Sequence, residues 1–353
     1  MASDPIAKNR PGKPGAVWAL TADLSSIIPP QDRALYISKS TNGGETWTPL
    51  ARVDSRYFKA EIAEGLRNGL SVSPGGTDFV ITTQEGAFQV IPQSSPSAAL
   101  VKAIAGPRVH LIPGVTIPKK EGDPVRAGVV EMTADGKHLI VAYGYFDDDP
   151  QLFTYRRDRR GSWIGDGTLP ALPTDLDIFS MQFDNPKKRR PDSLYVGTGD
   201  QAYHLNFRTK KWTRVAGVGP DSAIHGMSTV AGLHLAACWG VYNPVSADAV
   251  KRVTDASFLL HRAMDEVGPN IRAYGIEVDS ARPNREVLTA ITGVYISRNS
   301  GHSWQRLNAL PEGEFHSAHF NSDGTVIVSG FIGTFLVNPF SKTCSPYLKT
   351  RER

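Results

Sequence analysis

Arginine and histidine side chains recur at the beginnings of β-type segments in this sequence, and they carry its clearest chemistry. The polar residues at these positions are Arg67, Asn68, Arg126, Ser180, His225, Arg272 and His316. A guanidinium group binds carboxylate, sulfate or phosphate through paired hydrogen bonds, and an imidazole exchanges protons near neutral pH. Cations gathered in one place repel one another unless an anion lies among them. We expect an anionic ligand; the alternative, in which carboxylates of adjoining loops pair with the arginines, stays open.

A second group of candidates lies in the turns that follow the next β-type segments. It consists of Tyr145, Asp200, Trp239 and Tyr242. An aromatic ring beside polar groups is typical of sugar binding, because the ring packs against the apolar face of a pyranose. We expect Trp239 and Asp200 to contact the substrate, and Tyr145 or Tyr242 to donate a proton. Trp239 fits packing between sheets equally well.

Motifs for metals and cofactors are scarce. The chain has two cysteines, Cys238 and Cys344, which are too few for a disulfide framework or a four-thiolate metal site. The run Asp147–Asp149 has the oxygen ligands that Ca²⁺ prefers, although such a run more often forms a solvated cluster. We assign no metal site and no cofactor, and Ca²⁺ stays open.

Composition excludes several classes of function. The 353 residues carry a formal net charge of +4, which argues against nucleic acid binding. No apolar run approaches the roughly 18 residues of a membrane-spanning helix. We therefore expect a monomer with neither a nucleic acid nor a membrane partner. The N-terminus has no apolar signal core, which fits a cytoplasmic protein, or a secreted or periplasmic one whose leader was removed.

The segments that must position these residues are short and β-type. They run for six to nine residues, are rich in Val, Ile, Tyr and Thr, and are bounded by Gly, Asp, Asn or Pro. The first strands of repeated units begin near Arg67, Arg126, Phe179, His225, Arg272 and His316, 44 to 59 residues apart. This spacing predicts an all-β protein, a seven-bladed β-propeller with four-stranded blades, with six blades as the fallback. We predict one domain over residues 15–353 after a flexible segment, residues 1–14. The first strands would converge on the axis.

Two octapeptides match each other closely. Residues 40–47 and 297–304 both fit S-x-N-x-G-x-[TS]-W, and each follows a similar strand. Their polar residues and Gly suit a tight hairpin. The pattern resembles the Asp-box (BNR) repeat of sialidase-like β-propellers, with Asn42 and Asn299 where Asp is usual. The resemblance implies a propeller fold, with these hairpins away from the active face.

The resemblance makes sialidase the first comparison, but no Tyr–Glu nucleophile pair is assignable. β-Elimination on a uronate fits the residues better, because the substrate carboxylate must be neutralised before a base removes the adjacent proton. In this hypothesis Arg67, Arg126 and Arg272 hold the carboxylate, and His225 or His316 is the base. Tyr145 or Tyr242 is the acid. This plan resembles propeller-type polysaccharide lyases, including those that cleave a rhamnosyl–glucuronate linkage, and it implies an anionic oligosaccharide or polysaccharide as substrate.

Two other functions stay open. A non-catalytic propeller that binds glycans or proteins is one, because the hairpin units also resemble those of photosystem assembly-factor-type and sortilin-type propellers. A glycoside hydrolase that uses Asp147 and Asp200 as its carboxylate pair is the other, although the basic residues argue against it. The sequence leaves open the sugar, the linkage and whether the protein is an enzyme.

Overall fold

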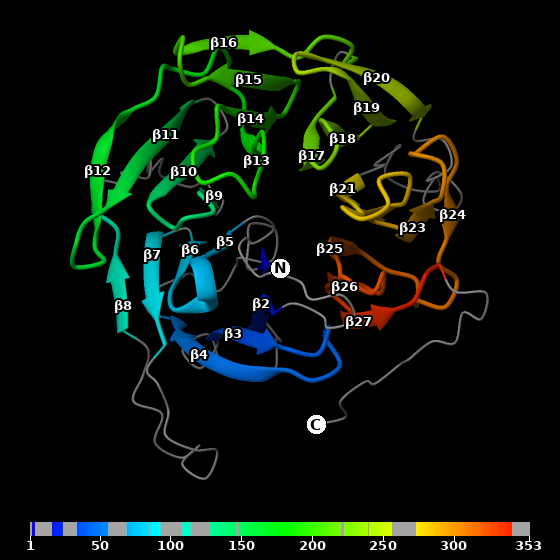
Figure 1. Ribbon diagram of the computed structural model, residues 1–353, viewed down its shortest axis with the longest axis horizontal. Coiled ribbons are helices and arrows are strands. Elements are labelled where there is room, and N and C mark those ends of the chain that lie inside the picture. Colours follow the sequence, from blue (N-terminus) through cyan, green and yellow to red (C-terminus); the bar gives the residue numbers. More distant parts are fainter. Residues whose placement is uncertain are drawn as a thin grey trace.

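The computed structural model describes residues 2–3, 16–23, 34–55, 69–83, 85–92, 108–113, 128–145, 148–219, 222–238, 240–255 and 273–340. Their strands form seven antiparallel sheets arranged around a central axis (Figure 1). Six sheets have four strands, and the seventh has three among the described residues. The predicted all-β, seven-bladed propeller is therefore confirmed, and the six-bladed fallback is not needed.

The first four blades follow one another along the chain. Blade 1 contains β1 (Ala2–Ser3), β2 (Val17–Asp23), β3 (Ala34–Ser40) and β4 (Thr48–Asp54). Blade 2 contains β5 (Leu70–Val72), β6 (Phe79–Thr83), β7 (Gly86–Ile91) and β8 (Arg108–Leu111), with a 3₁₀ turn at Pro74–Gly76. Blade 3 contains β9 (Val129–Met132), β10 (His138–Tyr145), β11 (Asp148–Arg157) and β12 (Trp163–Thr168). Blade 4 contains β13 (Ile178–Phe183), β14 (Ser193–Thr198), β15 (Ala202–Asn206) and β16 (Lys211–Arg214).

Three further blades complete the ring. Blade 5 contains β17 (Ile224–Ser228), β18 (His234–Ala237), β19 (Gly240–Ser246) and β20 (Ala249–Asp255). Blade 6 contains β21 (Ala273–Val278), β22 (Glu286–Ala290), β23 (Gly293–Ser297) and β24 (Gln305–Arg306). Blade 7 contains β25 (Phe315–Phe320), β26 (Val326–Gly330) and β27 (Gly333–Val337). The domain boundary at residue 14 stays a prediction; Ala2–Ser3, which precede it, pair with β2.

The first strand of each blade lies nearest the axis. Consecutive first strands contact one another in the order β1, β5, β9, β13, β17, β21 and β25 (Figure 1). We call the face at which these strands begin the upper face and the opposite one the lower face. The turns between second and third strands therefore lie at the upper face, and those between third and fourth strands at the lower face.

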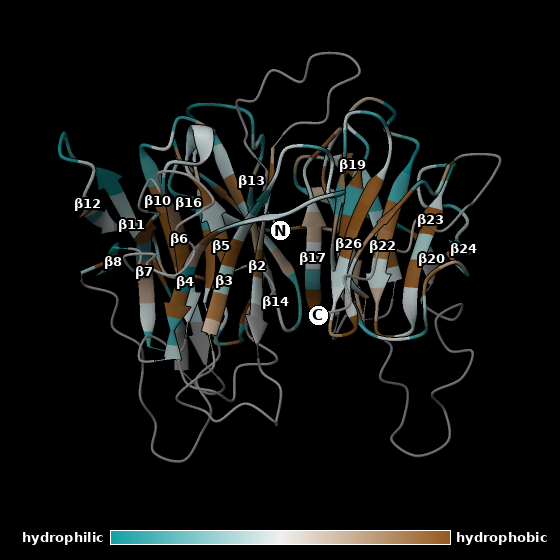
Figure 2. Ribbon diagram, turned by 90° about the horizontal axis from the view of Figure 1, so that it is seen from below, coloured by the Kyte–Doolittle hydropathy of each residue, from teal (hydrophilic) through white to brown (hydrophobic). Residues whose placement is uncertain are grey.

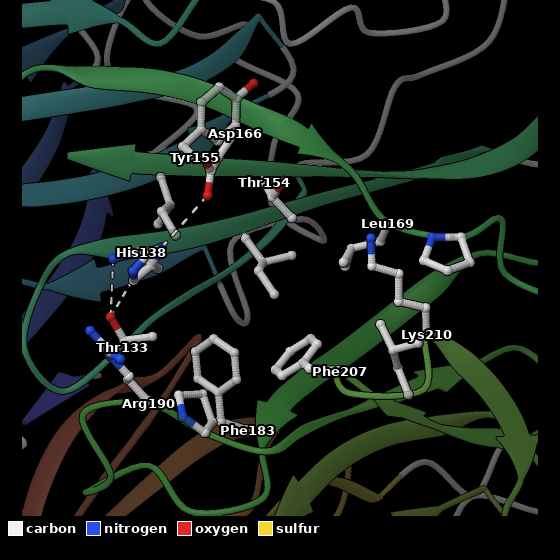
Figure 3. A pocket seen from close by; sticks show the side chains of 15 residues that line it. Thr133, His138, Thr154, Tyr155, Asp166, Leu169, Phe183, Arg190, Phe207 and Lys210 are labelled. Atoms are coloured by element: carbon white, nitrogen blue, oxygen red, sulfur yellow. Dashed lines mark hydrogen bonds and ion pairs between the residues drawn. The ribbon is translucent and has the colours of Figure 1, made fainter. Parts of the chain in front are cut away.

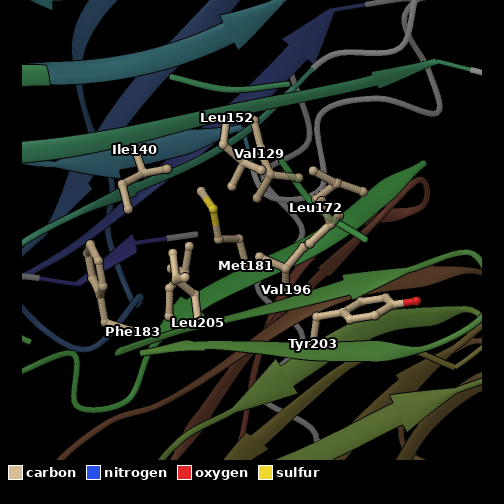
Figure 4. Packing of buried hydrophobic residues seen from close by; sticks show 12 residues of the cluster. Val129, Ile140, Leu152, Leu172, Met181, Phe183, Val196, Tyr203 and Leu205 are labelled. Atoms are coloured by element: carbon tan, nitrogen blue, oxygen red, sulfur yellow. The ribbon is translucent and has the colours of Figure 1, made fainter. Parts of the chain in front are cut away.

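Middle strands are buried on both sides because each blade packs between two others. Every residue of β6, β14 and β22 is buried, whereas the outer strand β16 is largely exposed. The apolar residues therefore gather along the strands, as the side view shows (Figure 2). Between blades 3 and 4 they form a continuous cluster that includes Ile140, Met181, Phe183 and Leu205 (Figure 4). Among the described residues, no helix is long and apolar enough to cross a membrane.

The two matching octapeptides form hairpins at the lower face with the same five hydrogen bonds. The serine hydroxyl donates to the asparagine side chain and accepts two backbone N–H groups, while the asparagine side chain bonds both the N–H and the hydroxyl four residues on. The matched residues are Ser40 with Ser297, Asn42 with Asn299, Gly44 with Gly301, and Thr46 with Ser303. Corresponding lengths differ by at most 0.2 Å. The repeated sequence therefore specifies one repeated geometry.

Each hairpin also ties its blade to the preceding one. Asn321 of blade 7 donates to the Gly43 carbonyl at 2.8 Å, and Asn243 of blade 5 donates to the Ser300 carbonyl at 2.5 Å. Gly43 and Ser300 occupy the same place in the two hairpins, with φ of 71° and 55°. The first of these bonds joins the last blade to the first and closes the ring.

Candidate binding site at the upper mouth of the axis

A row of ring-bearing residues lines the upper end of the axis. In β13, β17, β21 and β25 the register with the second strand shifts around the second residue, which is Phe179, His225, Tyr274 or His316. Such a β-bulge leaves one residue out of the ladder and re-aims its side chain. The same irregularity in four consecutive blades therefore gives four rings equivalent places around the mouth.

The rings contact one another in series. Centroids lie 4.6 Å apart between Phe179 and His225, 6.0 Å between His225 and Tyr274, and 4.9 Å between Tyr274 and His316. Phe331, in the turn between β26 and β27, extends the row at 4.7 Å from His316 in an edge-to-face arrangement. The result is a continuous aromatic and imidazole wall across blades 4 to 7, which we call the ring row.

A small residue follows each ring because the first strands of neighbouring blades approach closely there. A Cβ on Gly226 would lie 2.6 Å from the Gly275 Cα, and one on Gly275 would lie 3.0 Å from the His316 carbonyl oxygen. In blade 4 the small residue is Ser180, which is buried and donates its hydroxyl proton to the Ile224 carbonyl at 2.8 Å. The triplet apolar–ring–small is thus a requirement of blade packing.

This geometry changes the register expected for the mouth in blade 4. The sequence analysis placed Ser180 there, but the ring row contains Phe179, and Ser180 is buried with its hydroxyl on the Ile224 carbonyl. In blade 6 the ring row contains Tyr274, whereas Arg272, which the sequence analysis placed at the mouth, lies outside the described residues. The bulges cause the difference, because an extra residue shifts which side chain faces the axis. The recurring triplets Ile-Phe-Ser, Ile-His-Gly, Ala-Tyr-Gly and Phe-His-Ser are the sequence signal that could have identified the row.

Exposure rises along the ring row from blade 5 to blade 7. His225 and Tyr274 are buried, at 5% and 3% of their full exposure, and 14% of the His316 side chain is exposed. Phe331 is 56% exposed, and its neighbour Ile332 is 45% exposed. The blade 7 end of the row is therefore the part that solvent reaches most readily.

The two histidines of the ring row have different polar neighbours. The His316 Nε2 lies 3.5 Å from the Glu314 Oε1, and 23% of the Glu314 side chain is exposed. The His225 Nε2 lies 3.4 Å from the Cys238 Sγ, in the residue after β18. A carboxylate beside an imidazole can orient it, and His316 has such a neighbour in Glu314.

Two of the other predicted site residues lie in the walls and turns near the mouth. The Tyr242 phenol is buried in blade 5, 3.4 Å from the Ser222 hydroxyl, and accepts the Gly219 N–H at 3.4 Å. Asp200 lies in the β14–β15 turn of the upper face, where its carboxylate accepts the Thr198 hydroxyl at 2.7 Å. Tyr242 therefore packs in the apolar core of blade 5, and Asp200 stabilises its own turn.

Several predicted residues lie outside the described ones. They are Arg67, Asn68, Arg126, Trp239, Arg272 and Asp147, and the side chain of Tyr145. The anionic ligand that the arginines suggested, and the roles of these residues, stay predictions. No group of three or more His, Cys, Asp or Glu side chains that could hold a metal ion occurs among the residues that the structure describes.

Comparison with known proteins supports the fold. No protein-family model matches the sequence, and no curated protein matches it significantly. Many solved structures do resemble its fold. The chain is similar to the periplasmic gluconolactonase PpgL of Pseudomonas aeruginosa, with a TM-score of 0.56, 10% identity and 92% of each chain covered. A structure of YCF48 bound to D1 peptide gives a TM-score of 0.52 at 13% identity, covering 95% of this chain and 98% of that one.

A third similar structure is larger than this chain. It is the extracellular domain of a proposed one-component system from B. thetaiotaomicron, with a TM-score of 0.51 and 12% identity. The alignment covers 93% of this chain but 40% of that one. Together these similarities place the chain among β-propellers.

Proposed function

We propose that the upper mouth binds an anionic, uronate-type glycan and cleaves it by β-elimination, with His316 as the base. The observation that carries the proposal is the contact between His316 and Glu314 beside the exposed ring of Phe331. This is the one stretch of the ring row that combines a proton acceptor, a carboxylate to orient it, and an accessible apolar face.

Phe331 and Ile332 supply the binding surface in this proposal. Both are large apolar side chains that are about half exposed at the turn between β26 and β27. A pyranose presents one face made of C–H groups, which packs on such a surface while its hydroxyl groups remain hydrated. The arginines that the sequence analysis assigns to the mouth, Arg67, Arg126 and Arg272, would neutralise the uronate carboxylate.

The elimination needs one proton removed and one delivered. The His316 imidazole takes the proton on C5, the carbon that bears the carboxylate, and the electron pair of that C–H bond forms the C4–C5 double bond. The C4–O bond breaks, and the leaving oxygen takes a proton from an acid. Tyr274 and His225, the next residues of the ring row, are the nearest described candidates for that acid. Tyr145 and Tyr242 remain the candidates from sequence.

The unsaturated product absorbs near 235 nm, which gives the test. Wild-type protein is incubated with a panel of plant and bacterial uronate glycans, with and without Ca²⁺. We expect a rise in absorbance that His316→Ala reduces at least ~100-fold. His319→Ala is the matched control, because His319 lies on the same strand, has its own carboxylate neighbour Glu277 at 3.6 Å, and is not in the ring row. A flat trace across the panel, or full activity in His316→Ala, would refute the elimination.

The burial of His225 and Tyr274 favours a second function, a propeller that binds a glycan or protein without cleaving it. In that case the ring row is mainly structural, and Phe331 and Ile332 contact the ligand. Titration calorimetry with the same glycans would then show binding that Phe331→Ala abolishes and His316→Ala leaves intact. Hydrolysis by Asp147 and Asp200 stays the third candidate, and reducing ends without absorbance at 235 nm would reveal it.

A further inference from the structure

A second cavity lies at the lower face, far from the ring row, between blades 3 and 4. It has a volume of about 360 Å³ and is lined from both blades (Figure 3). Blade 3 contributes Ile140 of β10, and blade 4 contributes Phe183 of β13 and Leu205 of β15. Phe207 and Leu169 lie at the same end. This apolar floor is the lower end of the cluster that joins the two blades.

The floor is incompletely covered. Phe207 and Leu169 belong to the apolar cluster but are partly exposed, whereas Ile140, Phe183 and Leu205 are buried. The cavity therefore offers apolar surface that a side chain of another molecule could cover. Its volume suits one aromatic or large aliphatic side chain.

Two cationic side chains border the opening on its blade 4 side. Arg190 and Lys210 line it, and neither forms an ion pair with a carboxylate that the structure describes. The one carboxylate that lines the cavity, Asp166, is already shared by Arg156 at 3.4 Å and His138 at 3.9 Å. A carboxylate that enters the cavity would therefore contact Arg190 and Lys210, while Arg156 and His138 offset the charge of Asp166.

The positive charge extends beyond the cavity, because the neighbouring lower-face turns of blades 3 and 4 carry more basic side chains than acidic ones, the acidic ones being Asp135, Asp184 and Asp192. Exposed basic residues continue from its rim along three lower-face turns. They are Lys137 of blade 3, and Lys187, Lys188, Arg189, Arg190, Arg208 and Lys210 of blade 4. Lys188 is paired with Asp192. Cations spread over three turns exceed the reach of a small acid, so a ligand that contacts them must be an extended chain.

We propose that this cavity docks an acidic segment of a partner protein, with one aromatic side chain in the apolar floor and flanking carboxylates on Arg190 and Lys210. The apolar anchor supplies most of the binding free energy, and the charges set the orientation and accelerate association. The site lies on the opposite face from the ring row, so a partner held here leaves the upper mouth open. The proposal is independent of the function of that mouth.

The experiment uses three labelled probes and fluorescence anisotropy with the full chain. The first peptide is Glu-Asp-Glu-Phe-Glu-Asp-Glu with blocked ends, the second has Ala in place of Phe, and the third probe is N-acetylphenylalanine alone. We expect the first peptide to bind at least about tenfold more tightly than either of the others, and less tightly as salt rises. Equal binding of the Phe and Ala peptides, equal binding of N-acetylphenylalanine, or no binding of any peptide would overturn the proposal.

Charge reversal locates the site. The double variant Arg190→Glu with Lys210→Glu should weaken the Phe peptide at least about tenfold. The matched control, Arg214→Glu with Lys251→Glu, makes the same change in net charge at exposed positions that do not line the cavity. Equal affinity of the two double variants would overturn the proposal, because the peptide would then respond to net charge alone. Thermal unfolding of both variants checks that each is folded.

Discussion

The two ends of the first strands hold neighbouring blades together by different means. At the upper end of blades 5 and 6 the first strands meet backbone to backbone, at Gly226 and Gly275. At the lower end side chains bridge them: the Gln182 amide oxygen accepts the Thr229 N–H at 2.9 Å, and the Thr229 hydroxyl donates to the Phe183 carbonyl at 2.8 Å. Where two backbones are in close contact, only a residue without a side chain fits. Where side chains span the distance between two blades, their size decides whether a cavity remains.

This difference explains where each candidate site lies. The upper contact fixes the bulges, and the bulges give the ring row the same form in four blades. The lower gap allows the outer parts of blades 3 and 4 to separate enough for the cavity at Phe183 and Phe207. The ring row therefore follows from a feature that four blades share, whereas the lower cavity occurs where blades 3 and 4 differ from the other blades.

The substitution with the largest expected effect tests the close backbone contact between Gly226 and Gly275 at the upper end of the first strands. In Gly226→Ala the new methyl group would lie 2.6 Å from the Gly275 Cα and 2.7 Å from the Tyr274 carbonyl oxygen, so two backbones must move apart. We expect a loss of roughly 2–3 kcal/mol in the free energy of unfolding, measured by urea denaturation. Gly165→Ala on β12 is the control, since nothing lies within 4 Å of its Cβ, and it should be neutral. A stable Gly226→Ala would mean that the upper contact is not tight.

The strands and blades could be predicted from the sequence more completely than the side-chain arrangement at the upper and lower ends of the first strands. Turn residues and strand spacing identified the blades because they depend on local chemistry, and the two octapeptides gave one geometry for the same reason. The ring row contains His225 and His316, which the sequence analysis also singled out, together with Phe179 and Tyr274, which it did not assign to the site, because the bulges that align these rings change the register of each first strand. The burial of Tyr242 follows from blade packing, which its turn-like surroundings do not reveal.

The lower cavity could not be predicted from sequence. Its lining runs from Thr133 to Lys210, and these residues meet because two blades pack side by side. The residues of the basic run Lys187–Arg190 are exposed, as expected of a solvated turn. That Arg190 borders an apolar opening depends on β10 and β15, which are distant from it in the chain.

An intermediate effect on the free energy of unfolding is expected from the carboxyl group of Glu131, near the lower end of β9. Glu131 is paired with Ile140 in the β9–β10 register, and its carboxylate accepts the Phe183 N–H. Burial raises the pKa of Glu131 to about 8 from 4.5, an effect that the hydrogen bond from Phe183 partly offsets. The folded protein therefore favours the neutral form of Glu131, so the contribution of this group to the free energy of unfolding is greatest below pH 4.5 and falls as pH rises towards 8.

Glu131→Gln tests this dependence while keeping an oxygen for the Phe183 N–H. The variant should gain stability over wild type as pH rises from 5 to 8, by about 1 kcal/mol per pH unit. Urea denaturation at four pH values measures it, and the comparison with wild type cancels groups that both proteins share. A difference that does not change with pH would show that Glu131 is ionised in the folded protein.

The smallest effect concerns a side chain that bridges blades at the lower face. Asn321→Ala removes the bond to the Gly43 carbonyl that joins blade 7 to blade 1, and with it the bond to the Thr325 hydroxyl at 2.8 Å. We expect a loss of about 1 kcal/mol in the free energy of unfolding, because a side-chain hydrogen bond makes a net contribution of that order to stability. Asn243→Ala removes the equivalent bond to Ser300 within the ring and should cost a similar amount. Asn321→Ala could instead lower the free energy of unfolding as much as Gly226→Ala does. The contact between blades 7 and 1 would then depend on this hydrogen bond more than the other blade contacts do. The difference between the upper and lower ends of the first strands would in that case not apply to blades 7 and 1.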